Sequence, residues 1–250
     1  MLTIAVSFPI VRRVRRGGAD VARGRRRMTA RGRIVDRIGA RDGELLLVCP
    51  HFAGLRAGEA DLVGCLPIGD ANGATLALAS AFPDDPEVYA GIFAADPFRP
   101  APFLLAALRE AGVRSVVNLP TVAMAADGLA QALSHAGVDY AAELATLAKA
   151  TALGLRVLAV ATTVEQGRQA TAAGIGRLLF YPAADGDPTA RRRRAAAAVE
   201  AVRTMRATAP SAVILAFRHP DYGDELEPLI AAADGVVEWA IAPRAKTTAP

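Results

Sequence analysis

The chain alternates short apolar runs with longer helix-like stretches, and this alternation constrains its fold more than any other feature. From residue 45 onward, runs rich in Val, Leu, Ile and Ala recur, as is typical of buried strands. They lie at Leu45–Cys49, Val88–Ala94, Arg114–Val117, Arg156–Ala161, Arg177–Phe180, Ala212–Phe217 and Gly235–Trp239. Because strands that alternate with helices form parallel sheets, the pattern predicts an α/β protein.

Helix signals fill most of the intervals between these runs. Asp70 or Asn72 can cap a helix that extends to about Ser80, and Asp96-Pro97 is a start signal for a helix that ends at Glu110. Further helices are predicted at Val138–Leu153, Thr163–Ala173, Thr189–Thr208 and Asp224–Ala233, and a short one over residues 31–40.

A (β/α)8 TIM barrel needs eight strands, one more than the runs from residue 45 supply. Leu2–Phe8 is a strand-like run that could be the first strand, and the first β/α unit is the least regular part of the pattern. No Gly-x-Gly-x-x-Gly motif follows an early strand, which disfavours a dinucleotide-binding sheet. We therefore predict a single-domain TIM barrel.

Charge separates an amino-terminal arm from the body of the chain. Residues 1–41 contain twelve arginines against Asp20 and Asp36, whereas the whole chain carries a net charge of +4. We predict an arm over residues 1–41 that is loosely held between residues 10 and 30, a barrel over 42–242 and a disordered tail over 243–250. A basic arm can bind nucleic acid or an anionic membrane surface. This one has no aromatic residue among its arginines, so nucleic-acid binding is disfavoured. The alternatives are a solvated surface, or a stretch upstream of a start at Met28.

Composition also restricts where in the cell the protein is expected to be. The uncharged apolar stretches are well short of the roughly 20 residues that span a membrane, so we expect a soluble protein without a membrane partner. Leu2–Phe8 lacks the cleavage site of a secretory signal. Cys49 and Cys65 give neither a disulfide framework nor zinc-ligand spacing, which favours a reducing, cytoplasmic location.

Polar residues follow the predicted strands, at the end where barrel enzymes bind their ligands. The clearest case is Asn118-Leu119-Pro120-Thr121, where the proline ends a strand. We expect one pocket to gather Asp70, Asn72, Asp96, Asn118 and Thr121. His51, Asp185, Asp187, His219 and Glu238 occupy similar positions. The alternative is structural, because Asn, Asp and Thr often turn the chain or cap helices.

Three segments in register resemble a known family. They are Leu66–Asn72, with Gly-Asp-Ala-Asn; Ala90–Phe98, with Asp-Pro-Phe; and Asn118–Val122, with Asp127-Gly128 after it. Together they resemble the phosphoenolpyruvate hydrolase-like family of TIM barrels, also described as TIM-barrel signal-transduction proteins. The family's Tyr and Glu are similar to Tyr140 and Glu143. The likeness covers roughly residues 45–240.

The likeness is weaker in the second half. The family's His-containing loop after the sixth strand is replaced by Tyr181–Pro188, and its His-Gly-Gly-Pro turn by Phe217–Pro220. Its Ser-Ser-x-Glu-Arg segment is not matched by Gly235–Ala240, and its Gly-rich first strand is not found before residue 45. The resemblance therefore supports the family's fold for this chain more strongly than it supports the family's activity.

The resemblance implies an enzyme, a hydrolase or lyase, that acts on or binds a small phosphorylated or carboxylated metabolite. The alternative is a non-catalytic ligand-sensing barrel. The residues assigned to catalysis are Asn118, Thr121, Asp96 and Glu143, and those assigned to substrate binding are Asp70, Asn72, His51, Arg99 and His219. Arg56 and Arg218 are further candidates to hold an anion.

A cofactor is not fixed by the sequence. Mg²⁺ is the candidate metal, with oxygen ligands from Asp70, Asp96, Asp185 or Asp187. The substrate and oligomeric state are also left open, and a homo-oligomer is compatible with the sequence.

Overall fold

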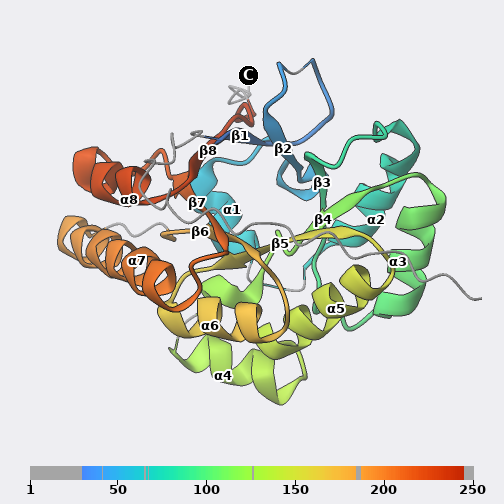
Figure 1. Ribbon diagram of the computed structural model, residues 1–250. Helices are drawn as coiled ribbons and strands as arrows, with labels where there is room; N and C mark the ends of the chain where they lie inside the picture. The colour runs from blue at the N-terminus through green and yellow to red at the C-terminus, as the bar shows by residue number, and fades with distance from the viewer. Residues whose placement is uncertain are drawn as a thin grey trace, which may run out of the picture.

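Eight parallel strands close into a barrel in the computed structural model, which describes residues 30–40, 42–64, 66, 68–125, 127–183 and 187–244. Each strand pairs in parallel with the next one along the chain, and β8 closes the ring against β1 (Figure 1). The predicted TIM barrel is confirmed.

The strands are β1 (Ala30–Val35), β2 (Leu45–Val48), β3 (Val88–Gly91), β4 (Ser115–Val117), β5 (Arg156–Ala161), β6 (Arg177–Phe180), β7 (Val213–Arg218) and β8 (Gly235–Trp239). All seven runs predicted from residue 45 onward contain strands, because apolar runs of four to seven residues suit a sheet that is buried on both faces.

The α-helices are α1 (Ala57–Gly64), α2 (Ala71–Ala77), α3 (Ala101–Glu110), α4 (Asp127–His135), α5 (Tyr140–Ala152), α6 (Val164–Ala172), α7 (Pro188–Thr208) and α8 (Glu227–Ala232). Short 3-10 helices lie at η1 (Pro50–Phe52), η2 (Ala79–Ala81), η3 (Val122–Met124) and η4 (Asp224–Leu226). Asp70 caps α2 as predicted, because its carboxylate accepts a hydrogen bond from the Gly73 amide at 2.7 Å.

The first strand is Ala30–Val35, inside the stretch assigned to the arm, so the helix predicted over residues 31–40 is wrong. The alternation of exposed Arg31 with buried Gly32 and Ile34 is that of a strand. Gly32 permits a close approach to β2, since a Cβ there would lie 2.8 Å from Leu45 Cδ2. This strand was not predicted, because arginine and glycine are poor strand signals. Leu2–Phe8 and the rest of residues 1–29 lie outside the described residues.

Asp96 does not begin a helix, contrary to the prediction. Helix α3 starts five positions later at Ala101, with Pro100 at its cap. Asp96 instead turns the chain, because its Oδ1 accepts a hydrogen bond from the Phe98 amide at 2.8 Å. Pro100 and Pro102 together favour the later start.

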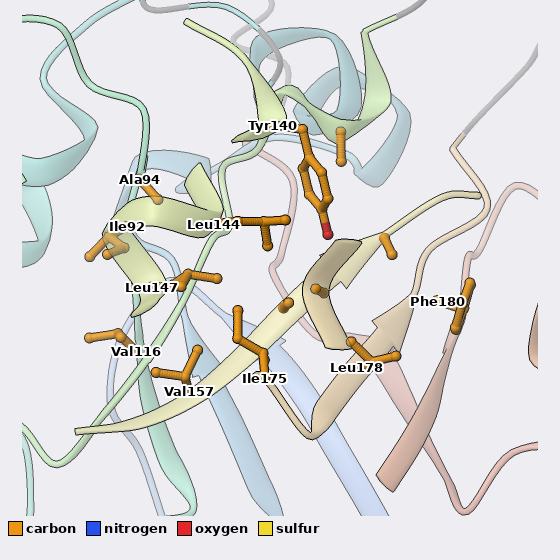
Figure 2. Packing of buried hydrophobic residues seen from close by; sticks show 14 of the residues in the cluster. Ile92, Ala94, Val116, Tyr140, Leu144, Leu147, Val157, Ile175, Leu178 and Phe180 are labelled. Carbon is orange, nitrogen blue, oxygen red and sulfur yellow. The ribbon is translucent and has the colours of Figure 1, made fainter. Parts of the chain in front are cut away.

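The barrel wall separates two apolar cores. Because successive side chains of a strand face opposite sides, Leu46 and Val48 pack toward the helices, whereas Leu45 and Leu47 fill the barrel interior. Figure 2 shows part of the outer core, in which Leu144 and Leu147 of α5 belong to the same cluster as Val116 of β4. The interior is also packed, so the barrel is not a pore.

Helix α1 is an addition to the repeating strand–helix pattern and lies across the carboxyl ends of the strands. In Figure 1 it lies inside the ring of strands, and Ala60 packs into the interior core. A Cβ at Gly64 would lie 3.3 Å from Phe52 Cζ and 3.7 Å from Pro120 Cβ. Helix α1 was not predicted, because its Ala-Gly-Glu-Ala-Asp-Leu-Val-Gly sequence lacks an apolar periodicity.

The tail predicted from Pro243 onward falls mostly outside the described residues. Arg244, which is described, donates its backbone N–H to the Gly54 carbonyl at 3.0 Å. Among the described helices, none is both long and apolar enough to cross a membrane.

We predict that deleting residues 1–27 leaves a folded protein, because all eight paired strands lie between residues 30 and 239. Circular dichroism should show a cooperative thermal transition with a midpoint close to that of the full chain. Loss of cooperative unfolding in the truncated protein would show that the barrel requires the deleted stretch.

Candidate functional site

The predicted site residues form three polar clusters at the carboxyl ends of the strands, not one pocket. Asn118 and Thr121 bond to Glu143, whereas Asn72 bonds to Asp96 and Asp70 pairs with Arg99. The third cluster joins His219 to Asp61 and Tyr181, which were not among the predicted site residues.

The first cluster, Asn118–Thr121–Glu143, is fully buried. Glu143 of α5 accepts hydrogen bonds from Asn118 Nδ2 at 2.7 Å, Thr121 Oγ1 at 2.6 Å and the Val122 amide at 2.8 Å. Asn118 Oδ1 accepts from the Val160 amide at 2.7 Å, which ties the end of β4 to β5. Thr121 also caps η3 by accepting from the Ala123 amide. The cluster therefore fixes the chain after β4 against α5 and β5.

Burial raises the pKa of Glu143 to about 7, and the three hydrogen bonds that it accepts oppose this shift without cancelling it. Tyr140, one turn earlier in α5, donates its hydroxyl to the Val160 carbonyl at 2.8 Å. The residues assigned to catalysis in this cluster thus have partners within the protein and no exposure to solvent. The contacts favour the structural alternative for Asn118 and Thr121.

The second cluster joins the loops after β3 to α2. Asn72 is fully buried and clamps Phe93, accepting from its amide at 3.0 Å and donating to its carbonyl at 3.0 Å. The same Nδ2 donates to Asp96 Oδ2 at 2.8 Å. Closer to solvent, Arg99 Nη2 lies 2.8 Å from Asp70 Oδ2. These contacts hold the Gly-Asp-Ala-Asn and Asp-Pro-Phe segments against each other.

A small cavity lies beside the second cluster. Its lining residues are His51, Leu66, Ile68, Gly69, Ala71, Phe93, Asp96, Phe98 and Pro120. The empty space, with its open mouth, is about 280 Å³, but the enclosed part has room for about one water molecule. Gly69, at φ +68°, approaches His51 so closely that a Cβ would lie 3.1 Å from His51 Cε1. Partial burial lowers the pKa of His51, and the charge of Asp70 acts in the opposite direction.

The third cluster, Asp61–Tyr181–His219, joins α1 to the carboxyl ends of β6 and β7. Asp61 Oδ1 accepts a hydrogen bond from Tyr181 Oη at 2.7 Å, and its Oδ2 lies 3.1 Å from His219 Nε2. The Asp221 amide donates to His219 Nδ1 at 3.1 Å, so in the neutral ring the proton is on Nε2 and points at Asp61. Burial, followed by the charge of Asp61, raises the pKa of Tyr181, which keeps its hydroxyl a donor.

Two members of the third cluster were missed. Tyr181 directly follows β6, so the strand-end position that selected His219 could have selected it as well. Asp61 lies in the unpredicted helix α1, and nothing in its local sequence marks it.

The remaining predicted residues have other partners. Arg218 pairs with Glu227 at 2.6 Å and with Glu238 at 3.5 Å, and the Arg56 side chain is exposed. Asp187 caps α7, and Asp185 lies outside the described residues.

These contacts do not fit the proposed Mg²⁺ site. Asp70 is engaged by Gly73 and Arg99, and Asp96 by Asn72 and Phe98. Within the described part of the chain, no three His, Cys, Asp or Glu residues are grouped so as to hold a metal ion.

Comparison with known proteins identifies the family of the chain. A family model described as phosphoenolpyruvate hydrolase-like matches residues 39–213. Protein y4oT of Sinorhizobium fredii is 36% identical over 134 residues, which cover 53% of this chain and 68% of that protein. The ToMV resistance protein Tm-1(GCR237) of Solanum lycopersicum is 37% identical over 102 residues, which are 40% of this chain but only 14% of that protein.

Solved structures give more distant matches. One, described as the native KDPGal structure, aligns over 84% of this chain and 82% of its own at 14% identity, with a TM-score of 0.42. A designed cube-shaped protein cage matches with a TM-score of 0.45 at 14% identity and covers 88% of this chain.

Proposed function

The chain belongs to the phosphoenolpyruvate hydrolase-like family, and on this basis we propose that it binds, and acts on, a small anionic metabolite at the carboxyl-end cavity. The observation that carries the proposal is the position of His51 and Asp96 in the cavity wall, with the Arg99–Asp70 pair beside it. Barrel enzymes bind ligands at this end of the strands.

The charged groups suit a carboxylate or phosphate. A guanidinium forms two parallel hydrogen bonds to such an anion, and an imidazolium adds a charge-assisted donor. The Asp70 carboxylate, which now pairs with Arg99, is 62% exposed, so an incoming anion could displace it toward solvent. The Asp96 carboxylate can accept a hydrogen bond from a ligand hydroxyl.

The cavity must widen to admit a metabolite, because its enclosed part has room for about one water molecule. Two residues of its rim are exposed apolar side chains, Ile68 at 48% and Phe98 at 85%. Side chains that make few contacts move at little cost, so we expect the rim to open at these two positions.

The first test is a thermal-shift screen with phosphate, acetate and sulfate, each with and without Mg²⁺. We expect the anions to raise the unfolding midpoint of the wild type without a requirement for Mg²⁺. His51→Ala and Arg99→Ala should each weaken binding at least tenfold, and Arg109→Ala, an exposed arginine on α3, is the matched control. Equal affinities in all four proteins would contradict the proposal.

We predict that anion binding strengthens as the pH falls. Because burial lowers the pKa of His51, its ring is mostly neutral at pH 7, and a bound anion favours the protonated ring. Titration calorimetry with sulfate, whose charge is constant over this range, should show higher affinity at pH 5.5 than at pH 7.5. The difference should disappear in His51→Ala. A pH dependence that persists in this variant would remove His51 from the site.

A non-catalytic, ligand-sensing barrel is the second candidate. It is favoured by the burial of Asn118, Thr121 and Glu143, which leaves three of the four residues assigned to catalysis without access to a ligand. Binding of an anion without conversion of any small carboxylate or phosphate ester tested would select this alternative.

A further inference from the structure

Two hydrogen-bond donors in the mouth of the barrel converge on a single carboxylate. Tyr181, at the end of β6, and His219, just after β7, each donate to one oxygen of Asp61. The Asp221 amide holds the His219 ring in the tautomer that donates from Nε2. Two fixed donors, one for each oxygen, form a recognition site for a carboxylate group.

The surroundings of these donors resemble a ligand site in composition. The Tyr181 ring stacks on Phe217 with centroids 4.1 Å apart, and His219 meets Phe217 edge-on at 5.4 Å. Both donors are buried among interior apolar side chains of the barrel. Small-molecule sites are characteristically apolar and aromatic pockets with a few convergent polar groups.

The carboxylate comes from an element that is not part of the barrel wall. Helix α1 buries only small or polar residues, namely Ala57, Ala60, Asp61 and Gly64, and it leaves Leu62 64% exposed. Alanine and glycine bury little apolar area, so packing contributes little to holding α1 in place. The bonds to Asp61 are therefore a large part of its attachment.

Helix α1 is followed by residues that border the cavity described above. Gly64, at its end, lies against Phe52 and Pro120, and Pro120 lines the cavity. The next described residues, Leu66 and Ile68, line it as well. Gly69, with its left-handed φ, ends this segment and can act as a hinge. An outward movement of α1 would expose Tyr181 and His219.

We propose that Tyr181 and His219 bind the carboxylate of a small ligand, and that α1 closes this site by placing the Asp61 carboxylate where the ligand's would bind. Tyr181 and His219 do not line the cavity of the proposed function, so they form a second site, which selects carboxylates among small anions. In this arrangement α1 is a lid that competes with the ligand.

Acetate, with acetamide as its neutral counterpart, tests the proposal. We expect Asp61→Ala to bind acetate at least tenfold more tightly than the wild type, because the ligand no longer competes with Asp61. Acetamide should bind neither protein. Adding Tyr181→Phe to Asp61→Ala should reverse the gain, and Asp42→Ala, which removes an exposed aspartate, should match the wild type. If Asp61→Ala does not fold, Asp61→Asn keeps the side-chain size and should show a smaller gain.

Hydrogen exchange in the wild type tests whether acetate binds a natural ligand site or only a cavity that the Asp61→Ala substitution creates. At 100 mM acetate, the amides of residues 57–64 should exchange several-fold faster than at 100 mM chloride, since the ligand displaces the lid. A purely structural Asp61 predicts acetate binding in Asp61→Ala but unchanged exchange of α1 in the wild type, and this result would overturn the proposal. So would equal acetate affinities in Asp61→Ala and the wild type.

The two proposals can fail separately. If His51→Ala and Arg99→Ala leave anion binding unchanged while Asp61→Ala gains acetate affinity through Tyr181, the cavity proposal is wrong and the carboxylate site stands. If the cavity variants lose sulfate binding but α1 does not respond to acetate, the reverse holds.

Discussion

Replacing Asn118 by alanine should lower the free energy of unfolding by about 2–6 kcal/mol and leave anion affinity unchanged. The substitution removes the acceptor of the Val160 amide and a donor to the Glu143 carboxylate, both of them buried. A buried polar group without its partner costs about 1–3 kcal/mol, and a charged one more. Urea unfolding measures the first quantity, and calorimetry with sulfate measures the second.

Gln131→Ala is the control for Asn118→Ala, since it removes an exposed amide from α4 and should change stability by less than about 0.5 kcal/mol. A small loss of stability in Asn118→Ala, combined with a tenfold loss of affinity, would instead assign Asn118 to the ligand site.

Glu143 should make the protein less stable as the pH rises from 4.5 to 7. Its pKa is about 7 in the folded protein, against an ordinary value of 4.5, so the folded state binds the proton more tightly than the unfolded state. Stability from this group is fully present below pH 4.5, is lost between pH 4.5 and 7, and is constant above that. A shift of this size corresponds to roughly 3 kcal/mol.

The measurement compares the wild type with Glu143→Gln, whose side chain does not titrate. The difference in unfolding free energy between the two should change by about 3 kcal/mol from pH 4.5 to pH 8, with the wild type relatively less stable at pH 8. Glu110→Gln, at an exposed position of α3, should give a flat difference. A flat profile for Glu143→Gln as well would show that the hydrogen bonds from Asn118, Thr121 and Val122 fully offset the cost of burial.

The family-like segments have a structural explanation that does not involve a ligand. Asn72 joins the Gly-Asp-Ala-Asn segment to the Asp-Pro-Phe segment through Asp96 and Phe93. Glu143 joins the third segment to α5. In each case a fully buried side chain satisfies backbone groups at the end of a strand, where the regular pairing of the sheet stops. A motif at the carboxyl end of a barrel strand can thus mark an anchored loop as well as a functional site.

The sequence by itself determined the barrel, because short apolar runs that alternate with amphipathic stretches leave few other ways to bury both faces of a parallel sheet. The sequence also predicted the residue that caps a helix, as at Asp70. The first strand was not, since Arg31, Gly32 and Arg33 gain their strand pairing only from the neighbouring β2 and β8.

Only the tertiary structure decided which polar residues meet. Asn118 and Glu143 are 25 residues apart, and Asp61 and His219 are 158 apart, so no local pattern predicts either pair. Strand-end position correctly placed Asn118, Thr121 and His219 at the mouth of the barrel, but position alone does not say which way a side chain points or what covers it. The cover here is α1, whose place over the mouth follows from the bonds between Asp61, Tyr181 and His219, not from any periodicity of its own.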